Sequence, residues 1–204
     1  MVQNHLLQLL CITAMEPPAN MDSYSIRNET LKVLQSTRIY KTDEEMNENV
    51  VIGQYLGGEG ENSYREENNV DRQSHTETYA AIRFYIDNWR WHGVPFYLRT
   101  GKRMAEASTM VSICFKQPPK QFFRSMHIDK IPPNWLIMSM SPEESMRLEM
   151  TVKEPGIEMN TRQISLDAPF RCEDCNQADA YEGLLLDVIE GDRSLFLRFD
   201  EVEY

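Results

Sequence analysis

The sequence VPFYLRTGKR, at residues 94–103, has the pattern of a β-strand with a basic end. Pro95 fixes the start, and Phe96 and Leu98 alternate with side chains suited to solvent, as in a half-buried strand. Similar strand patterns, with no helical pattern between them, occur at residues 78–86, 110–115, 135–140, 146–153 and 162–166. Successive strands without intervening helices predict a mainly antiparallel sheet rather than a parallel βαβ arrangement.

Helical patterns occupy the two ends of the chain. They occur at residues 6–12, 23–35 and 179–189, with a further short one near residue 200. Two prolines end the first, Asp22 or Ser23 caps the second, and Gly191 stops the third. We therefore predict an α+β fold, a large mainly antiparallel sheet with helices packed on one face, in which residues 1–204 form a single domain.

The composition limits the possible partners. The chain carries 21 Lys and Arg against 32 Asp and Glu, a net charge of −11. This negative charge disfavours binding to nucleic acid or to an anionic membrane, so a local basic site must attract any anionic ligand. No stretch reaches the roughly 20 apolar residues of a membrane span, and the first residues lack the basic flank of a signal peptide. We expect a soluble, cytoplasmic protein.

The cysteines indicate neither a disulfide scaffold nor a metal site. Cys11 and Cys114 lie among apolar residues, where cysteine acts as a small core side chain. Cys172 and Cys175 form a lone CxxC motif with two carboxylates between them. Zinc would need two further ligands, and an active thiol would need nearby cations. We therefore expect no metal and no redox centre.

The basic end of the strand at residues 94–103 is a candidate anion site. Arg99, Lys102 and Arg103 surround Gly101, whose lack of a side chain allows the backbone to turn closely past a ligand. A solvated turn at the end of a strand fits the same residues, and the spacing alone slightly favours that interpretation.

His5 is the candidate general base among the four histidines. It opens an apolar helix, and a neutral imidazole there can project into a cleft. The others stand in polar loops and are expected to be solvated; they are His75, His92 and His127. The sequence contains no glycine-rich phosphate loop, so it shows no nucleotide-binding turn of its own.

Six short motifs run through the chain in a fixed order. They are QNHLLQ at residues 3–8, GQY at 53–55, WHGVPF at 91–96, RTGK at 99–102, KEPG at 153–156 and DAYE at 179–182. In this order and spacing they resemble the C-terminal domain of glucose-6-phosphate dehydrogenase, over the whole chain. The family oxidises D-glucose 6-phosphate to 6-phospho-D-glucono-1,5-lactone with reduction of NADP, in the oxidative pentose phosphate pathway.

The resemblance implies roles for individual residues. His5 matches the general base that takes the proton of the C1 hydroxyl, and Lys102 matches a lysine that contacts the sugar substrate near its phosphate. Ala107 stands where relatives carry a second basic residue, so Arg103 is the candidate that replaces this substrate-binding cation. The carboxylate that orients the histidine in the family falls upstream of Met1.

The resemblance also concerns cofactor and partners. NADP is expected to bind mainly to an N-terminal nucleotide-binding domain that this chain lacks, so the isolated chain is expected to be inactive. Some relatives hold a structural NADP with basic residues; the aligned positions here are Ser108, Ser112, Ser139 and Glu149, so we expect no such site. A homodimer through the sheet is expected.

Two other functions remain open at this point. One is a non-catalytic sugar-phosphate-binding or assembly module that shares the same sheet. The other is a degraded relative without activity, for which Ala107 is the only indication.

Overall fold

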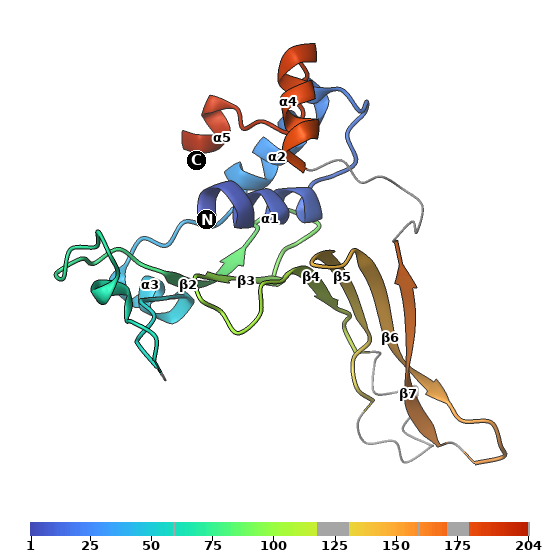
Figure 1. Ribbon diagram of the computed structural model, residues 1–204. Coiled ribbons are helices and arrows are strands. Elements are labelled where there is room, and N and C mark those ends of the chain that lie inside the picture. The colour runs from blue at the N-terminus through green and yellow to red at the C-terminus, as the bar shows by residue number, and fades with distance from the viewer. Residues whose placement is uncertain (59, 118–130, 159, 171–179, 204) are drawn as a thin grey trace. The chain divides into compact units, whose positions relative to one another are not determined.

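The structure is a computed structural model that describes residues 1–58, 60–117, 131–158, 160–170 and 180–203. The chain divides into two compact units, one of Met1–Met104 with Gln177–Tyr204 and the other of Ala105–Asn176. The first unit contains η1 (Val2–Leu6), α1 (Leu7–Ala14), α2 (Ser23–Gln35), α3 (Asp43–Asn49), β1 (Val50–Gly53), η2 (Tyr64–Glu66), β2 (Tyr79–Tyr85), β3 (Pro95–Gly101), α4 (Ala180–Glu190) and α5 (Phe199–Glu203) (Figure 1). The second contains β4 (Thr109–Cys114), β5 (Trp135–Ser141), β6 (Ser145–Lys153) and β7 (Thr161–Pro169).

The first helices start where local hydrogen bonding dictates. η1 is a π-helical turn in which the amide of Leu6 donates to the carbonyl of Met1 at 3.3 Å, and it continues directly into α1. Asp22 caps α2, because one of its carboxylate oxygens accepts the amides of Tyr24 and Ser25 at 3.0 and 2.9 Å. The predicted start of this helix is confirmed.

The sheet of the first unit has three strands in the order β1-β2-β3, and both pairs are antiparallel. Phe84 lies opposite Phe96 and Ile82 opposite Leu98, so these side chains share one face. α1 and α2 pack on that face, and the buried core there consists of Leu10, Cys11, Ala14, Val33 and Ile86. Burial raises the pKa of the Cys11 thiol to about 12, which keeps it protonated and unreactive.

α3 and the opposite face of the sheet are joined through Arg83. Its Nε donates to the side-chain oxygen of Asn49, the last residue of α3, at 2.7 Å. Thr42 and Glu45 form a capping box at the start of α3, each side chain accepting a backbone amide of the other residue. This helix was not predicted, because its sequence DEEMNEN has no apolar face.

The C-terminal segment returns to the first helices (Figure 1). Gln3 of η1 donates through Nε2 to the carbonyl of Val202 in α5 at 2.9 Å. The hydroxyl of Thr30 in α2 donates to the buried carboxylate of Glu201. These bonds therefore attach α5, near the end of the chain, to η1 and α2, near its start.

The second unit is a four-stranded sheet in the order β4-β5-β6-β7. All its neighbouring strands are antiparallel. Arg147 on β6 lies opposite Asp167 on β7, and their side chains form an ion pair at 2.5 Å between Nε and Oδ1. This pair crosslinks the two longest strands of the described residues.

The predicted α+β class is confirmed. Every strand pair in the described residues is antiparallel, and α1 and α2 cover one face of the β1-β2-β3 sheet. The strands are divided between two sheets, one in each unit. The assignment of residues 1–204 to a single domain stays a prediction.

Two further expectations concern the CxxC motif and membrane-spanning helices. The CxxC motif of Cys172 and Cys175 lies outside the described residues. None of the helices in the described ranges has the length and apolar character required to cross a membrane.

Candidate functional site

Lys102 is the first residue after β3, in the first unit. Its backbone amide donates to the carbonyl of Thr78 at 2.8 Å, one bond beyond the pair of Tyr79 with Gly101. Its side chain is exposed, and none of the described residues forms a hydrogen bond or ion pair with its ammonium group. An ammonium without a partner, on a fixed backbone, is available to an anionic ligand.

Gly101 allows the chain to fold back on itself at this end. A Cβ atom at this position would lie 2.8 Å from Sδ of Met104 and 3.0 Å from the ring of Tyr79. Both distances are shorter than ordinary contact, so the missing side chain makes room for Met104. Gly101 therefore allows close approach of Met104 and Tyr79 of the same chain, whereas the sequence had suggested close approach of a ligand.

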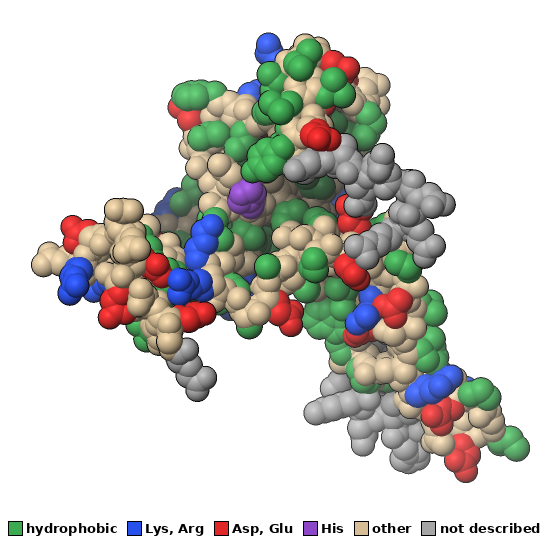
Figure 2. All heavy atoms as spheres, viewed as in Figure 1, with side chains coloured by type: hydrophobic (Ala, Val, Ile, Leu, Met, Phe, Trp, Pro, Cys, Tyr) green, Lys and Arg blue, Asp and Glu red, His purple; other side chains and the backbone are tan. Residues whose placement is uncertain are grey.

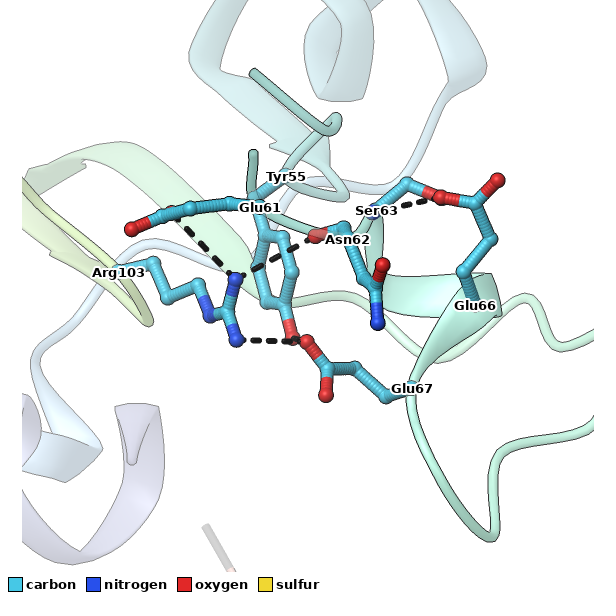
Figure 3. A network of polar contacts seen from close by, with 7 residues as sticks. All are labelled: Tyr55, Glu61, Asn62, Ser63, Glu66, Glu67 and Arg103. Carbon is cyan, nitrogen blue, oxygen red and sulfur yellow. Dashed lines mark hydrogen bonds and ion pairs between the residues drawn. The ribbon is translucent and has the colours of Figure 1, made fainter. Parts of the chain in front are cut away.

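Arg103 has a different environment from Lys102, although it is the next residue (Figure 3). Its Nη2 lies 2.7 Å from Oε1 of Glu67, and its Nη1 lies 3.4 Å from Oε2 of Glu61. Nη1 also donates to the carbonyl of Asn62 at 3.3 Å. The guanidinium thus has two carboxylate partners within the protein, and its expected contact with substrate stays a prediction.

Tyr55 lies beneath this guanidinium (Figure 3). The Cζ atom of Arg103 is 5.0 Å from the centre of the Tyr55 ring, and the phenol donates to Oε1 of Glu67 at 3.3 Å. Loss of solvent contact, and then the Glu67 charge, raise the pKa of Tyr55, while Arg103 lowers it. Tyr55, Arg103 and Glu67 therefore form one connected group, which we call the Arg103 cluster.

His5 is exposed in η1, and η1 packs against β3, the strand that leads into Lys102. The first unit therefore brings together the elements that carry the expected base and the expected lysine. Figure 2 shows Lys and Arg side chains gathering with a histidine on one face of this unit. Of the three expected site residues, Arg103 is paired with carboxylates, whereas the side chains of His5 and Lys102 are exposed and form no hydrogen bond or ion pair within the part of the chain that the structure describes.

A pocket of about 480 Å³ opens at the end of β1, and Tyr55 of the Arg103 cluster is one of its lining residues. Its polar lining includes Gln54, Arg65 and His75, and none of the three expected site residues. The Gln54 side chain accepts a hydrogen bond from Nε of Arg65 at 3.0 Å. In the part of the chain that the structure describes, no group of three His, Cys, Asp or Glu residues could hold a metal ion.

Comparison with known families decides the relationship. Residues 1–204 match the family described as glucose-6-phosphate dehydrogenase, C-terminal domain. The chain belongs to this family. A glucose-6-phosphate 1-dehydrogenase of Mycolicibacterium smegmatis is 46% identical over 208 residues, which cover 100% of this chain and 41% of the relative. One from Bacillus subtilis is 40% identical over 207 residues, covering 99% of this chain and 42% of the relative.

Solved structures agree with the family assignment. A glucose-6-phosphate dehydrogenase in complex with its substrate glucose-6-phosphate matches with a TM-score of 0.86 at 34% identity, covering 100% of this chain and 41% of that chain. The glucose-6-phosphate 1-dehydrogenase of Mycobacterium avium matches with a TM-score of 0.80 at 33% identity, covering 100% and 40%. The chain therefore spans about two fifths of the length of these relatives.

Three of the four residues that align with the structural NADP site expected in some relatives share one face of the second sheet. The strand register places Ser112, Ser139 and Glu149 on that face, together with Arg147. Arg147 is paired with Asp167, and Glu149 adds a negative charge. These side chains do not fit a 2′-phosphate, and the expected absence of this NADP site stays a prediction.

Sequence reasoning missed the Arg103 cluster. Tyr55 was visible as part of the GQY motif, but nothing in the sequence linked it to a residue near position 103. Glu67 lies in a loop with several carboxylates, and no pattern distinguished it from Glu61 or Glu66. The sequence shows an acidic loop and an arginine directly after the glycine-lysine turn, but no sequence signal pairs the two.

Proposed function

We propose that this chain is the substrate-binding and dimerisation domain of an NADP-dependent glucose-6-phosphate dehydrogenase. The enzyme oxidises D-glucose 6-phosphate to 6-phospho-D-glucono-1,5-lactone. The observation that carries the proposal is the ammonium of Lys102 at the end of β3, which has no hydrogen-bond or ion-pair partner among the described residues. The turn that bears His5 packs against the same strand, β3. This arrangement occurs in a chain whose relatives are named glucose-6-phosphate 1-dehydrogenases.

The two residues take complementary parts. His5 accepts the proton of the C1 hydroxyl through a nitrogen of its imidazole ring, the commonest general base in enzymes. NADP, when bound, supplies the acceptor for the hydride that leaves C1. Lys102 binds the substrate through its phosphate by a charge-assisted hydrogen bond. Arg103 is the second cation that the resemblance suggests, but its guanidinium is paired with Glu61 and Glu67, so the contact with the phosphate is assigned here to Lys102.

The proposal includes a nucleotide-binding domain outside this chain. NADP binds mainly there, which accounts for the absence of a glycine-rich phosphate loop from this sequence. The complete enzyme forms a homodimer through the sheet and acts in the cytoplasm, in the oxidative pentose phosphate pathway of glucose metabolism.

The experiment joins this chain to the nucleotide-binding region of a relative and follows reduction of NADP on addition of glucose 6-phosphate. We expect turnover from the joined protein and none from the chain alone. Replacing His5→Asn should reduce kcat by roughly 100-fold or more, the usual contribution of a general base. His92→Asn, at an exposed histidine in a loop, is the matched control and should leave kcat unchanged.

The outcomes separate the open functions. Turnover that survives His5→Asn would remove His5 as the base. Binding of glucose 6-phosphate without turnover, in a joined protein that still binds NADP, would favour the non-catalytic module instead.

A further inference from the structure

Thr78 joins two segments that meet beside Lys102. This residue is 8% exposed, and its hydroxyl oxygen accepts the amide of Tyr55 at 2.9 Å. Its carbonyl accepts the amide of Lys102 at 2.8 Å. One buried residue thus fixes the backbone at the start of the 54–67 loop and at the end of β3.

The side chains of the Arg103 cluster form a second connection between the 54–67 loop and the end of β3. The guanidinium of Arg103 stacks on the ring of Tyr55 at 5.0 Å and pairs with Glu67 at 2.7 Å. Contacts therefore form a ring, from Lys102 through Thr78 and Tyr55 to Arg103, which is bonded covalently to Lys102. The backbone of Lys102 is held on both sides.

The backbone of Arg103 has a conformation that these contacts help to stabilise. Its φ angle is 52°, in the left-handed region that costs a residue with a side chain more than it costs glycine. The stacking on Tyr55 and the ion pair with Glu67 offset that cost, because both require the side chain to point into the loop (Figure 3). Without these two contacts, nothing would offset the conformational cost at Arg103, and the turn that orients Lys102 would favour another backbone conformation.

We propose that Arg103 is a positioning residue, which together with Glu67 and Tyr55 orients Lys102 toward the substrate. This inference rests on the proposed function of Lys102. Arg103 acts here through the backbone rather than on the phosphate, because a phosphate on its guanidinium would be repelled by Glu67, 2.7 Å away. The ammonium of Lys102, by contrast, has no competing carboxylate among the described residues.

The key variant is Glu67→Gln in the joined protein, because it leaves the charge of Arg103 intact. A positioning role predicts that Glu67→Gln raises the KM for glucose 6-phosphate by about fivefold, as loss of a half-exposed ion pair allows, while kcat changes by less than about twofold. Direct binding of phosphate by Arg103 predicts the opposite, a lower KM, because a competing negative charge is removed. A lower or unchanged KM would overturn the proposal.

Further variants test whether the two residues act as a unit. Arg103→Met should raise KM as Glu67→Gln does, and the double variant should be no worse than either single one. Arg103→Lys keeps the charge but loses the planar fork, so it should not restore KM. Glu61→Gln is the matched control, since its carboxylate is 3.4 Å from the guanidinium and 71% exposed, and it should leave KM unchanged.

A measurement without substrate separates this proposal from the proposed function. Arg103→Met should speed hydrogen exchange of the amides at residues 54–67 and of Lys102, relative to the parent. Unchanged exchange would refute the positioning role, whatever the kinetics. An unchanged KM in Lys102→Met, with faster exchange in Arg103→Met, would instead refute the assigned role of Lys102 and leave the cluster as a purely structural device.

Discussion

The hydroxyl oxygen of Thr78 accepts the backbone amide of Tyr55 at 2.9 Å, in a position where Thr78 is almost fully buried. Replacing Thr78→Val preserves shape but leaves that amide without an acceptor. We expect the free energy of unfolding to fall by about 1–2 kcal/mol, the usual cost of a buried group left unsatisfied. Chemical denaturation followed by circular dichroism would measure it.

Thr76→Val is the control for this effect. Thr76 is exposed two residues away, and its hydroxyl takes part in none of the hydrogen bonds among the described residues. Its loss of stability should stay within about 0.5 kcal/mol, as for most surface changes. Equal losses in the two variants would show that the bond from Tyr55 contributes nothing.

Affinity for glucose 6-phosphate should depend far more on Lys102 than on Arg99, the basic residue within β3. In the joined protein, Lys102→Met should raise the KM for glucose 6-phosphate between about 10-fold and 100-fold, the range expected for a lost charge-assisted hydrogen bond. Arg99→Met removes the same charge from another exposed side chain near the end of β3. It should raise KM by less than about threefold. Similar increases would indicate a diffuse positive field rather than one specific lysine.

Helix α2 should become less stable in acid because of its cap. The hydrogen bonds that Asp22 accepts, first from the amide of Ser25, hold the pKa of the Asp22 carboxyl below its usual range. The carboxylate therefore stabilises the folded state fully above its unfolded pKa of about 4, and this contribution is lost as pH falls through the lower folded pKa. Asp22→Asn keeps a capping oxygen that does not titrate.

Melting temperatures measured from neutral pH down to about pH 2.5 would show the difference, since aspartate titrates in this range. The parent should have the higher melting temperature at neutral pH. The difference in melting temperature between the parent and Asp22→Asn should become smaller as the pH falls. A difference in melting temperature that stays constant with pH would mean that the charge of Asp22 makes no contribution to stability.

The elements that were predicted from the sequence are those that local patterns specify. The alternation of Phe96 and Leu98 predicted a half-buried β3, and both side chains do contact the core. Asp22 predicted the start of α2 because a cap is a contact between near neighbours. His5 and Lys102 were predicted as site residues from motifs that are each local, and their roles stay predictions.

The elements that were not predicted depend on contacts between distant residues. α3 has no apolar face, and Arg83, which lies far along the chain, bonds its last residue. The ion pair between Glu67 and Arg103 joins two segments that the sequence separates by a strand pair. The expected contact of Arg103 with substrate stays a prediction, and its ion-pair partners in the loop at residues 54–67 could not be predicted from the sequence.

A substitution at Gly101 tests whether the turn at the end of β3 requires a residue without a side chain. Gly101→Ala would place a Cβ atom 2.8 Å from Sδ of Met104, so that side chain must move. We expect a loss of about 1–2 kcal/mol in the free energy of unfolding, as in other overpacked sites. Met104 is 40% exposed, so its side chain can be shortened at little cost.

The double variant Gly101→Ala with Met104→Ala should therefore recover part of the lost stability. It should not recover all of it, because the ring of Tyr79 would still lie 3.0 Å from the new Cβ atom, and this ring has less freedom to move than the end of a methionine. Denaturation of the four proteins of this cycle would measure the coupling between positions 101 and 104. Losses that simply add would show that Met104 is not what requires a glycine at this turn, and that the constraint comes from Tyr79.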